Sequence, residues 1–169
     1  ALSVSIRDLP ADAQNAAIGT IPRVFSRVQD KKLAADTVEK ALEPALKQAH
    51  TAAAAWTTIG RMRREAGQLA QAVEAVRKGI ASDASASGPL MLALSMASAA
   101  PTDVLPLLLN AMKGPVAPEL RLGYARLLIG QHAYPEALAQ LHKLNADHPT
   151  FADGWMAVSY THLRAHETG

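Results

Sequence analysis

The sequence predicts an all-α protein in which pairs of antiparallel helices repeat along the chain. Of its 169 residues, 49% are hydrophobic, 19% are charged and only 4% are aromatic, and alanine and leucine supply much of the apolar content. Alanine and leucine favour helices, whereas the aromatic and β-branched residues that favour strands are scarce. The second observation behind the prediction is a pattern of apolar residues, glycines and prolines that returns at a regular spacing.

Residues 1–52 are expected to form a degenerate helical repeat. Helical spacing of apolar residues predicts one helix over Ala11–Val28 and a second over Lys31–Lys47. Pro22 and Pro44 each predict a kink or a helix end, because proline lacks the backbone N–H that a helix interior needs.

Residues 53–86 carry the clearest repeat, with a first helix, a turn around Gly67 and a second helix. Large apolar residues are expected to fill the space between the two helices, and small residues to let the two backbones approach closely. These landmarks are Trp56, Ile59, Gly60, Ala72 and Val76.

The same pattern returns in residues 118–151, at a constant numbering offset of 65. Gly60, Ala72, Val76 and Ala84 then correspond to Ala125, Ala137, Leu141 and Pro149. From Arg121 to Trp155 the numbering offset is 34, so residues 152–157 are expected to begin a further repeat. Because 65 is 34 plus 31, residues 87–117 are expected to form a degenerate repeat shortened by three residues, most simply in the turn at 98–102.

These landmarks, over residues 53–157, resemble the signature of the tetratricopeptide repeat. The resemblance implies a right-handed superhelical solenoid of antiparallel helix pairs, whose inner wall is formed by the first helix of each pair. Segments such as 21–27 and 134–137 are more loosely similar to large multi-repeat proteins of Gram-negative proteobacteria, which often carry an export signal. This second resemblance implies a bacterial, periplasmic or outer-membrane-associated protein, whereas the residues themselves leave a cytoplasmic location open.

Both ends of the chain carry an expectation of their own. The sequence starts at Ala1 without a methionine, and we expect it to be a fragment of a longer protein. Residues 158–168 resemble the translation, in one reading frame, of a transposon-type sequencing adapter, as in metagenomic libraries. We therefore expect residues 158–169 to be a non-native tail.

The first helices of the repeats supply the candidate binding groove. Its candidate residues are Thr57, Arg61, Arg64, Leu122 and Arg126. The three arginines would offer guanidinium groups to the carboxylates of a partner, although a solvated basic face explains them at least as well. The expected function is a protein- or peptide-binding scaffold, and the alternatives are a helical-repeat RNA binder and a purely structural spacer.

Other functional classes find little support in the sequence. A net charge of +2 with scattered basic residues does not indicate nucleic-acid binding, and no apolar stretch is long enough to span a membrane. No phosphate-binding glycine loop and no activated nucleophile is recognisable, so we expect no enzyme and no cofactor. His162 and His166 are spaced as a metal-binding pair on a helix, but they lie in the expected tail, so we predict no metal site.

Overall fold

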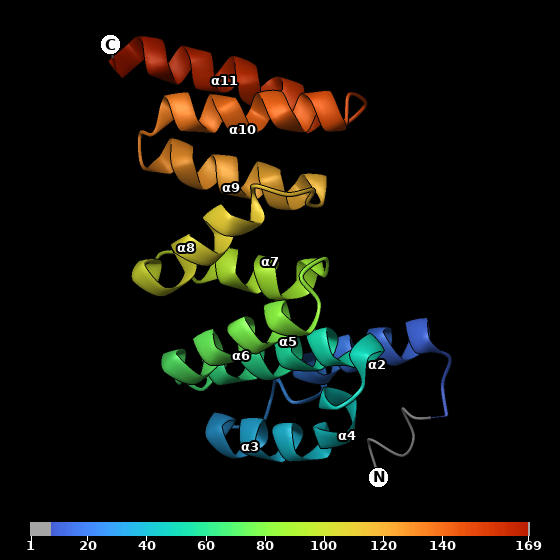
Figure 1. Ribbon diagram of the computed structural model, residues 1–169. Coiled ribbons are helices and arrows are strands. Elements are labelled where there is room, and N and C mark those ends of the chain that lie inside the picture. The colour runs from blue at the N-terminus through green and yellow to red at the C-terminus, as the bar shows by residue number, and fades with distance from the viewer. Residues whose placement is uncertain (1–7, 169) are drawn as a thin grey trace. The chain divides into compact units, whose positions relative to one another are not determined.

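The structure is a computed structural model of the chain and describes residues 8–168. Within this range the regular secondary structure consists of ten helices, which pack against one another without any strand (Figure 1). The prediction of an all-α protein is confirmed. The chain divides into two compact units, of which the first ends at Leu107 and the second begins at Leu108.

Within residues 8–168, the first unit contains six complete helices and the second contains three. Those of the first unit are α2 (Ala11–Val24), α3 (Lys31–Ala41), α4 (Glu43–Leu46), α5 (Ala49–Glu65), α6 (Leu69–Ser82) and α7 (Ser87–Ser95). The boundary falls within α8 (Pro101–Ala111), and α9 (Pro118–Gly130), α10 (Tyr134–Asp147) and α11 (Ala152–Thr168) follow.

Prolines mark helix ends, as the sequence suggests, but not at every expected place. Pro44 lies in the first turn of α4, and the helix expected over Lys31–Lys47 is interrupted at Leu42. Pro22 lies near the end of α2, which stops four residues before the predicted end at Val28. Pro118 and Pro135 lie in the first turns of α9 and α10, where a missing N–H costs nothing.

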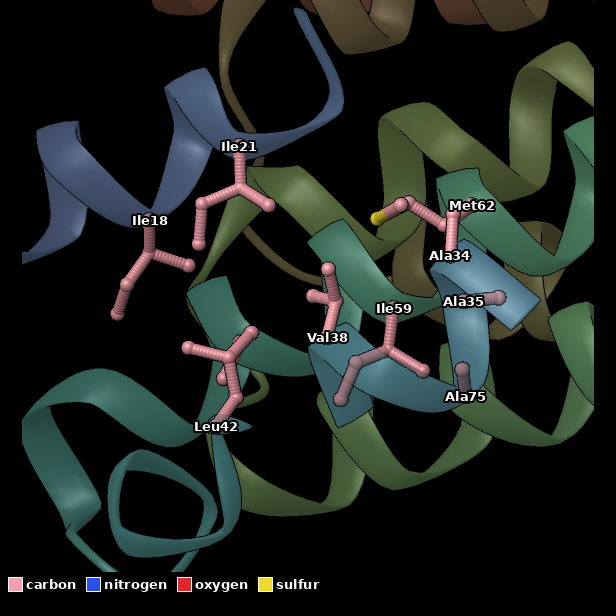
Figure 2. Close-up of a cluster of buried hydrophobic side chains, with 10 residues drawn as sticks. Ile18, Ile21, Ala34, Ala35, Val38, Leu42, Ile59, Met62 and Ala75 are labelled. Atoms are coloured by element: carbon pink, nitrogen blue, oxygen red, sulfur yellow. The ribbon is translucent and has the colours of Figure 1, made fainter. Parts of the chain in front are cut away.

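The core of the first unit forms where α2 and α3 pack onto α5 (Figure 2). Its side chains are at most 5% exposed, and the close-up shows them gathered between these helices. Burial of apolar surface contributes roughly 25 cal/mol per Å², so this cluster is a main source of stability for the unit. Its members are Ile18, Ile21, Ala34, Ala35, Val38, Leu42, Ala55, Ile59, Met62 and Ala75.

Helices α5 and α6 form the most extensive helix pair in the structure. A Cβ atom added to Gly60 would lie 3.3 Å from the Ala75 Cβ and 3.5 Å from the Ala72 carbonyl oxygen. Ala72 and Val76 are fully buried. The small residues therefore allow the close approach that the repeat pattern predicts.

Helices α9 and α10 pair in the second unit around Leu122, Ala125, Leu141 and Leu144. Helix α11 packs along α10, where a Cβ atom on Gly154 would lie 3.1 Å from the Leu144 Cδ2 atom. The glycine thus permits a close helix contact at this joint.

The turn between α5 and α6 and the turn between α9 and α10 have the same backbone geometry. Gly67 has a φ of +75°, and its N–H donates to the Arg64 carbonyl at 3.0 Å. His132, its counterpart in the second pair, has a φ of +60°, and its N–H donates to the Ile129 carbonyl at 3.0 Å. In both turns, the helix ends with a residue in the left-handed backbone conformation, which glycine favours. The two residues with positive φ are therefore separated by the same numbering offset of 65 that separates the landmark residues of the two pairs.

Candidate partner-binding surface

Thr57, expected in the groove, is a packing residue of α5. It is 6% exposed, and its hydroxyl donates to the Ala53 carbonyl at 2.7 Å. A Cβ atom on Gly88 at the start of α7 would lie 2.9 Å from the Thr57 Oγ1 atom, so α7 covers this position. The expectation that Thr57 faces a partner is corrected, because it offers little free surface.

Arg61 and Arg64 lie one helical turn apart near the end of α5, and both are partly exposed. The Arg64 guanidinium donates to the Ser95 hydroxyl on α7, which orients it across the face shared by the two helices. These arginines remain the accessible cationic groups among the groove residues predicted for the first unit.

Leu122, the first candidate on α9, belongs to the apolar core of the second unit. It is only 4% exposed and packs with Ala125, Leu141 and Leu144. Its assignment to the groove is corrected for the same reason as that of Thr57. In both helix pairs a neighbouring helix covers the position.

Arg126 is exposed and borders an open cavity of about 510 Å³ along α9 and α11 in the second unit. The opening combines one cationic side chain, one carboxylate and a larger apolar area. Its other lining residues are Ile129, Gly130, Asp153, Met156, Ala157 and Tyr160.

The apolar side chains of this cavity are largely exposed to solvent. The Met156 side chain is 72% exposed and that of Tyr160 is 53% exposed. Sequence reasoning missed these residues, although the repeat spacing could have found them. At the numbering offset of 34, Met156 and Tyr160 correspond to Leu122 and Arg126, which were both predicted to line the groove. Tyr160 lies in the segment expected to be a tail, whereas Met156 precedes it.

Smaller hollows also lie among the described residues of the first unit. One, of about 170 Å³, lies beside Trp56, whose ring carries the Lys78 ammonium 4.7 Å from its centroid. The other, of about 360 Å³, lies between the starts of α5 and α7 and includes Asn15, His50 and Asp83. Hydrogen bonds from the Ser85 hydroxyl and then from the Ser85 N–H lower the pKa of the Asp83 carboxyl. Neither hollow contains a residue predicted for the groove.

Two arginines that were not predicted to line the groove, Arg63 and Arg121, are buried. The Arg63 guanidinium lies 2.6 Å from an Asp36 oxygen and 3.4 Å from a Glu39 oxygen, and so ties α5 to α3. Arg121 is 2% exposed and donates to the Met112 and Gly114 carbonyls and to the Gln140 side chain. Burial lowers the pKa of the Arg121 guanidinium, which still remains a cation at neutral pH. Both arginines hold helices together.

The histidines that could suggest a metal pair, His162 and His166, lie on the exposed side of α11. Among residues 8–168, no three histidine or acidic side chains come together in a group that could hold a metal ion. In the same part of the chain, no helix has the length and apolar character needed to cross a bilayer.

The chain matches no protein-family model, and no curated protein matches it at a significant level.

Proposed function

We propose that the chain is a tetratricopeptide-like helical-repeat scaffold that binds a peptide segment of another protein. The observation that carries this proposal is the open cavity along α9 and α11, in which Arg126 borders an exposed apolar surface. The repeat reading is supported by the common offset of 65, which links landmark residues as well as the turns at Gly67 and His132.

The chemistry of the cavity favours a segment with an apolar side chain next to a carboxylate. The apolar side chain would cover Ile129 and Met156, which removes their surface from water. Arg126 would donate charge-assisted hydrogen bonds to the carboxylate. Asp153 borders the same opening and would disfavour a second acidic group. The proposed partner therefore carries few charges, placed at defined positions.

Selection from a phage-displayed library of random peptides against the full chain tests this proposal. We expect the selected peptides to combine apolar and acidic residues. Their affinity should fall by about tenfold or more in Arg126→Glu, because a favourable charge contact becomes a repulsive one. Lys143→Glu is the matched control, since Lys143 is an exposed cation of α10 that does not line the cavity.

Other outcomes would contradict the proposal. Binding that is equally weakened by the two charge reversals would reflect net charge and not the cavity. If peptides fail to bind but a generic oligonucleotide binds with a steep salt dependence, the chain is an RNA binder instead. Tyr160→Ala measures how much residues 158–168 contribute to the cavity.

On the sequence resemblances, we further propose that the chain is part of a longer, exported bacterial multi-repeat protein, and that residues 158–168 are not native to it. An independent genomic copy of the gene tests both points. It should continue the repeat after Ala157 with different codons. Recovery of the codons for 158–168 in that copy would show that this part of α11 is native.

A further inference from the structure

The connection between α2 and α3 concentrates positive charge. Residues 22–33 contain a single acidic residue and four basic residues, Arg23, Arg27, Lys31 and Lys32. The whole chain has 17 basic and 15 acidic residues, so acidic residues outnumber basic ones outside this segment. The small net charge of the chain therefore conceals a local basic surplus.

The same segment exposes apolar side chains. Val24 is 72% exposed, Leu33 is 59% exposed and Val28 is 39% exposed. Val24 and Leu33 are the most exposed large hydrophobic side chains among the described residues of the first unit. A single exposed apolar residue is ordinary on a protein surface, whereas a group of them with polar surroundings indicates an interaction site.

Hydrogen bonds hold this segment in one compact corner of the first unit. The Lys31 ammonium donates to the Ser26 carbonyl at 2.6 Å and to the Phe25 carbonyl at 3.5 Å, which holds the start of α3 against the end of α2. The Asp30 carboxylate accepts the Leu33 N–H at 2.9 Å and so caps α3. Phe25 packs against the core cluster. The backbone of the corner is therefore fixed by the fold.

Three cations of this corner are available to a partner. Arg23, Arg27 and Lys32 are exposed, and within residues 8–168 none of them forms an ion pair. The acidic residues that follow on α3, Asp36 and Glu39, pair with a buried arginine of α5 instead. The positive charge of the corner is thus not neutralised by the described part of the chain. We name the exposed group of Arg23, Val24, Arg27, Val28, Lys32 and Leu33 the basic corner.

The shape of the basic corner favours one kind of partner. A side chain of a protein partner is best received by a hollow, but neither hollow described in the first unit includes a residue of the basic corner. Apolar side chains that protrude beside cations match a bilayer surface instead. There the apolar groups enter the boundary between headgroups and acyl chains, and the cations meet the lipid phosphates.

We propose that the basic corner binds the surface of a membrane that contains anionic lipids. The two valines and Leu33 enter the interface, while the exposed cations remain at the level of the phosphates. The attachment is peripheral and goes beyond the proposed binding of a peptide. The peptide cavity shares no lining residue with the basic corner, so the two proposals can fail independently.

Single-site fluorescent labelling of the full chain tests the proposal, because the sequence contains no cysteine. Val24→Cys carries the environment-sensitive fluorophore NBD on the basic corner. Leu109→Cys carries the same label as a matched control, since Leu109 is also an exposed apolar residue, 53% exposed, of α8. The probes are vesicles of phosphatidylcholine alone and vesicles with equal parts of phosphatidylcholine and phosphatidylglycerol. Flotation of the unsubstituted chain with these vesicles measures binding without a label.

We expect the label on the basic corner to brighten and shift to shorter wavelength with the anionic vesicles, while the control label does not change. Arg27→Glu together with Lys32→Glu should weaken binding by at least about tenfold. The matched control is Lys113→Glu together with Lys143→Glu, which reverses two exposed cations of the second unit and changes the net charge equally. It should weaken binding by less than about twofold, because distant charges are screened by salt.

The proposal is overturned if the two labels respond alike, or if the two double charge reversals weaken binding equally. Equal binding to neutral and anionic vesicles would overturn the role of the cations. A response to polyglutamate without a response to vesicles would replace the membrane with an acidic protein partner. A change of the basic-corner label that grows with protein concentration without vesicles would also overturn the proposal, because a second copy would then cover the corner.

Discussion

The helix pair α5–α6 and the helix pair α9–α10 follow one backbone plan with different side chains. Both turns end the first helix with a residue at positive φ, and both pairs bury an alanine in the second helix, Ala72 or Ala137. On the first helix of each pair, however, Trp56 of α5 corresponds to Arg121 of α9 at the numbering offset of 65. The same backbone plan therefore accommodates an indole ring in one pair and a guanidinium group in the other, each with its own contact partners.

The contact of α6 with α7 and the contact of α10 with α11 differ in which of the two helices supplies a glycine. At the joint of α6 and α7, Gly79 lies against Pro89, and at the joint of α10 and α11, Leu144 lies against Gly154. Leu144 and Gly154 are the counterparts of Gly79 and Pro89 at the numbering offset of 65. Each joint therefore has one glycine and one larger residue, on opposite sides.

The largest expected difference between the two pairs comes from removing Arg121. Arg121→Met keeps most of the side-chain volume but leaves the Met112 and Gly114 carbonyls without this donor. Unsatisfied buried polar groups cost about 1–3 kcal/mol each, and we expect a loss of about 3 kcal/mol. Urea unfolding followed by tryptophan fluorescence in a Trp56→Phe background, in which Trp155 is the remaining tryptophan, measures it, with the exposed Arg126→Met as control. Equal stability of the two variants would show that Arg121 does not hold the pair together.

Removing the ring at the matching position of the first pair should cost less. Trp56 is only partly buried, so we expect Trp56→Ala to lower the free energy of unfolding by about 2–3 kcal/mol, below the about 3–5 kcal/mol of a fully buried aromatic. Lys78→Ala alone should cost about 0.5–1 kcal/mol through the lost cation–π contact. Thermal unfolding followed by circular dichroism measures both. An unchanged melting curve for Trp56→Ala would contradict the repeat register.

The two turns offer a smaller, directly matched test. Gly67→Ala places a Cβ atom at a φ of +75° and should destabilise the first unit by about 1 kcal/mol. His132→Gly relieves the same strain but removes the 2.9 Å contact between the His132 Nδ1 atom and the Tyr134 hydroxyl. We expect its net effect to be stabilising and below about 1 kcal/mol. Chemical denaturation of both variants decides whether the turns are equivalent, and a stability loss in His132→Gly would show that the Tyr134 contact dominates.

The smallest effect concerns Asp83, after α6, whose counterpart after α10 is His148. Because the folded-state pKa of Asp83 is lowered, its contribution to stability is present above the unfolded pKa of about 3.9 and is lost as pH falls through the folded pKa. Ser85→Ala removes the main cause, so the carboxyl should titrate at higher pH. An NMR titration of the Asp83 carboxyl carbon checks this, with Ser82→Ala as a control that does not touch the carboxyl. Identical midpoints in Ser85→Ala and the unsubstituted chain would contradict the assignment.

Much of the architecture could be predicted from periodicity and helix-ending residues, because these are local properties of the sequence. The start of α9 at Pro118 and the turn at Gly67 follow from proline and glycine chemistry. Helix α5 starts at Ala49, earlier than the repeat boundary at residue 53, since alanines at 52–55 extend the helix without interruption.

The surface was less predictable, because exposure depends on neighbours far away in sequence. Thr57 is covered by α7, and Leu122 by α10, and neither contact is visible in the spacing along one helix. Arg121 carried a signal, its regular spacing from Trp155, but spacing alone does not tell a buried arginine from an exposed one.

The opposite placement of glycine at the two joints limits how the repeats can be recombined. A chimera that joined α10 directly to α7 would bring Leu144 against Pro89, two large residues where each natural joint has one. Joining α6 to α11 would bring Gly79 against Gly154 and leave a void that lowers stability. Although the pairs share a backbone plan, they cannot be exchanged freely. In a chimera, α6 must be kept together with α7, and α10 together with α11.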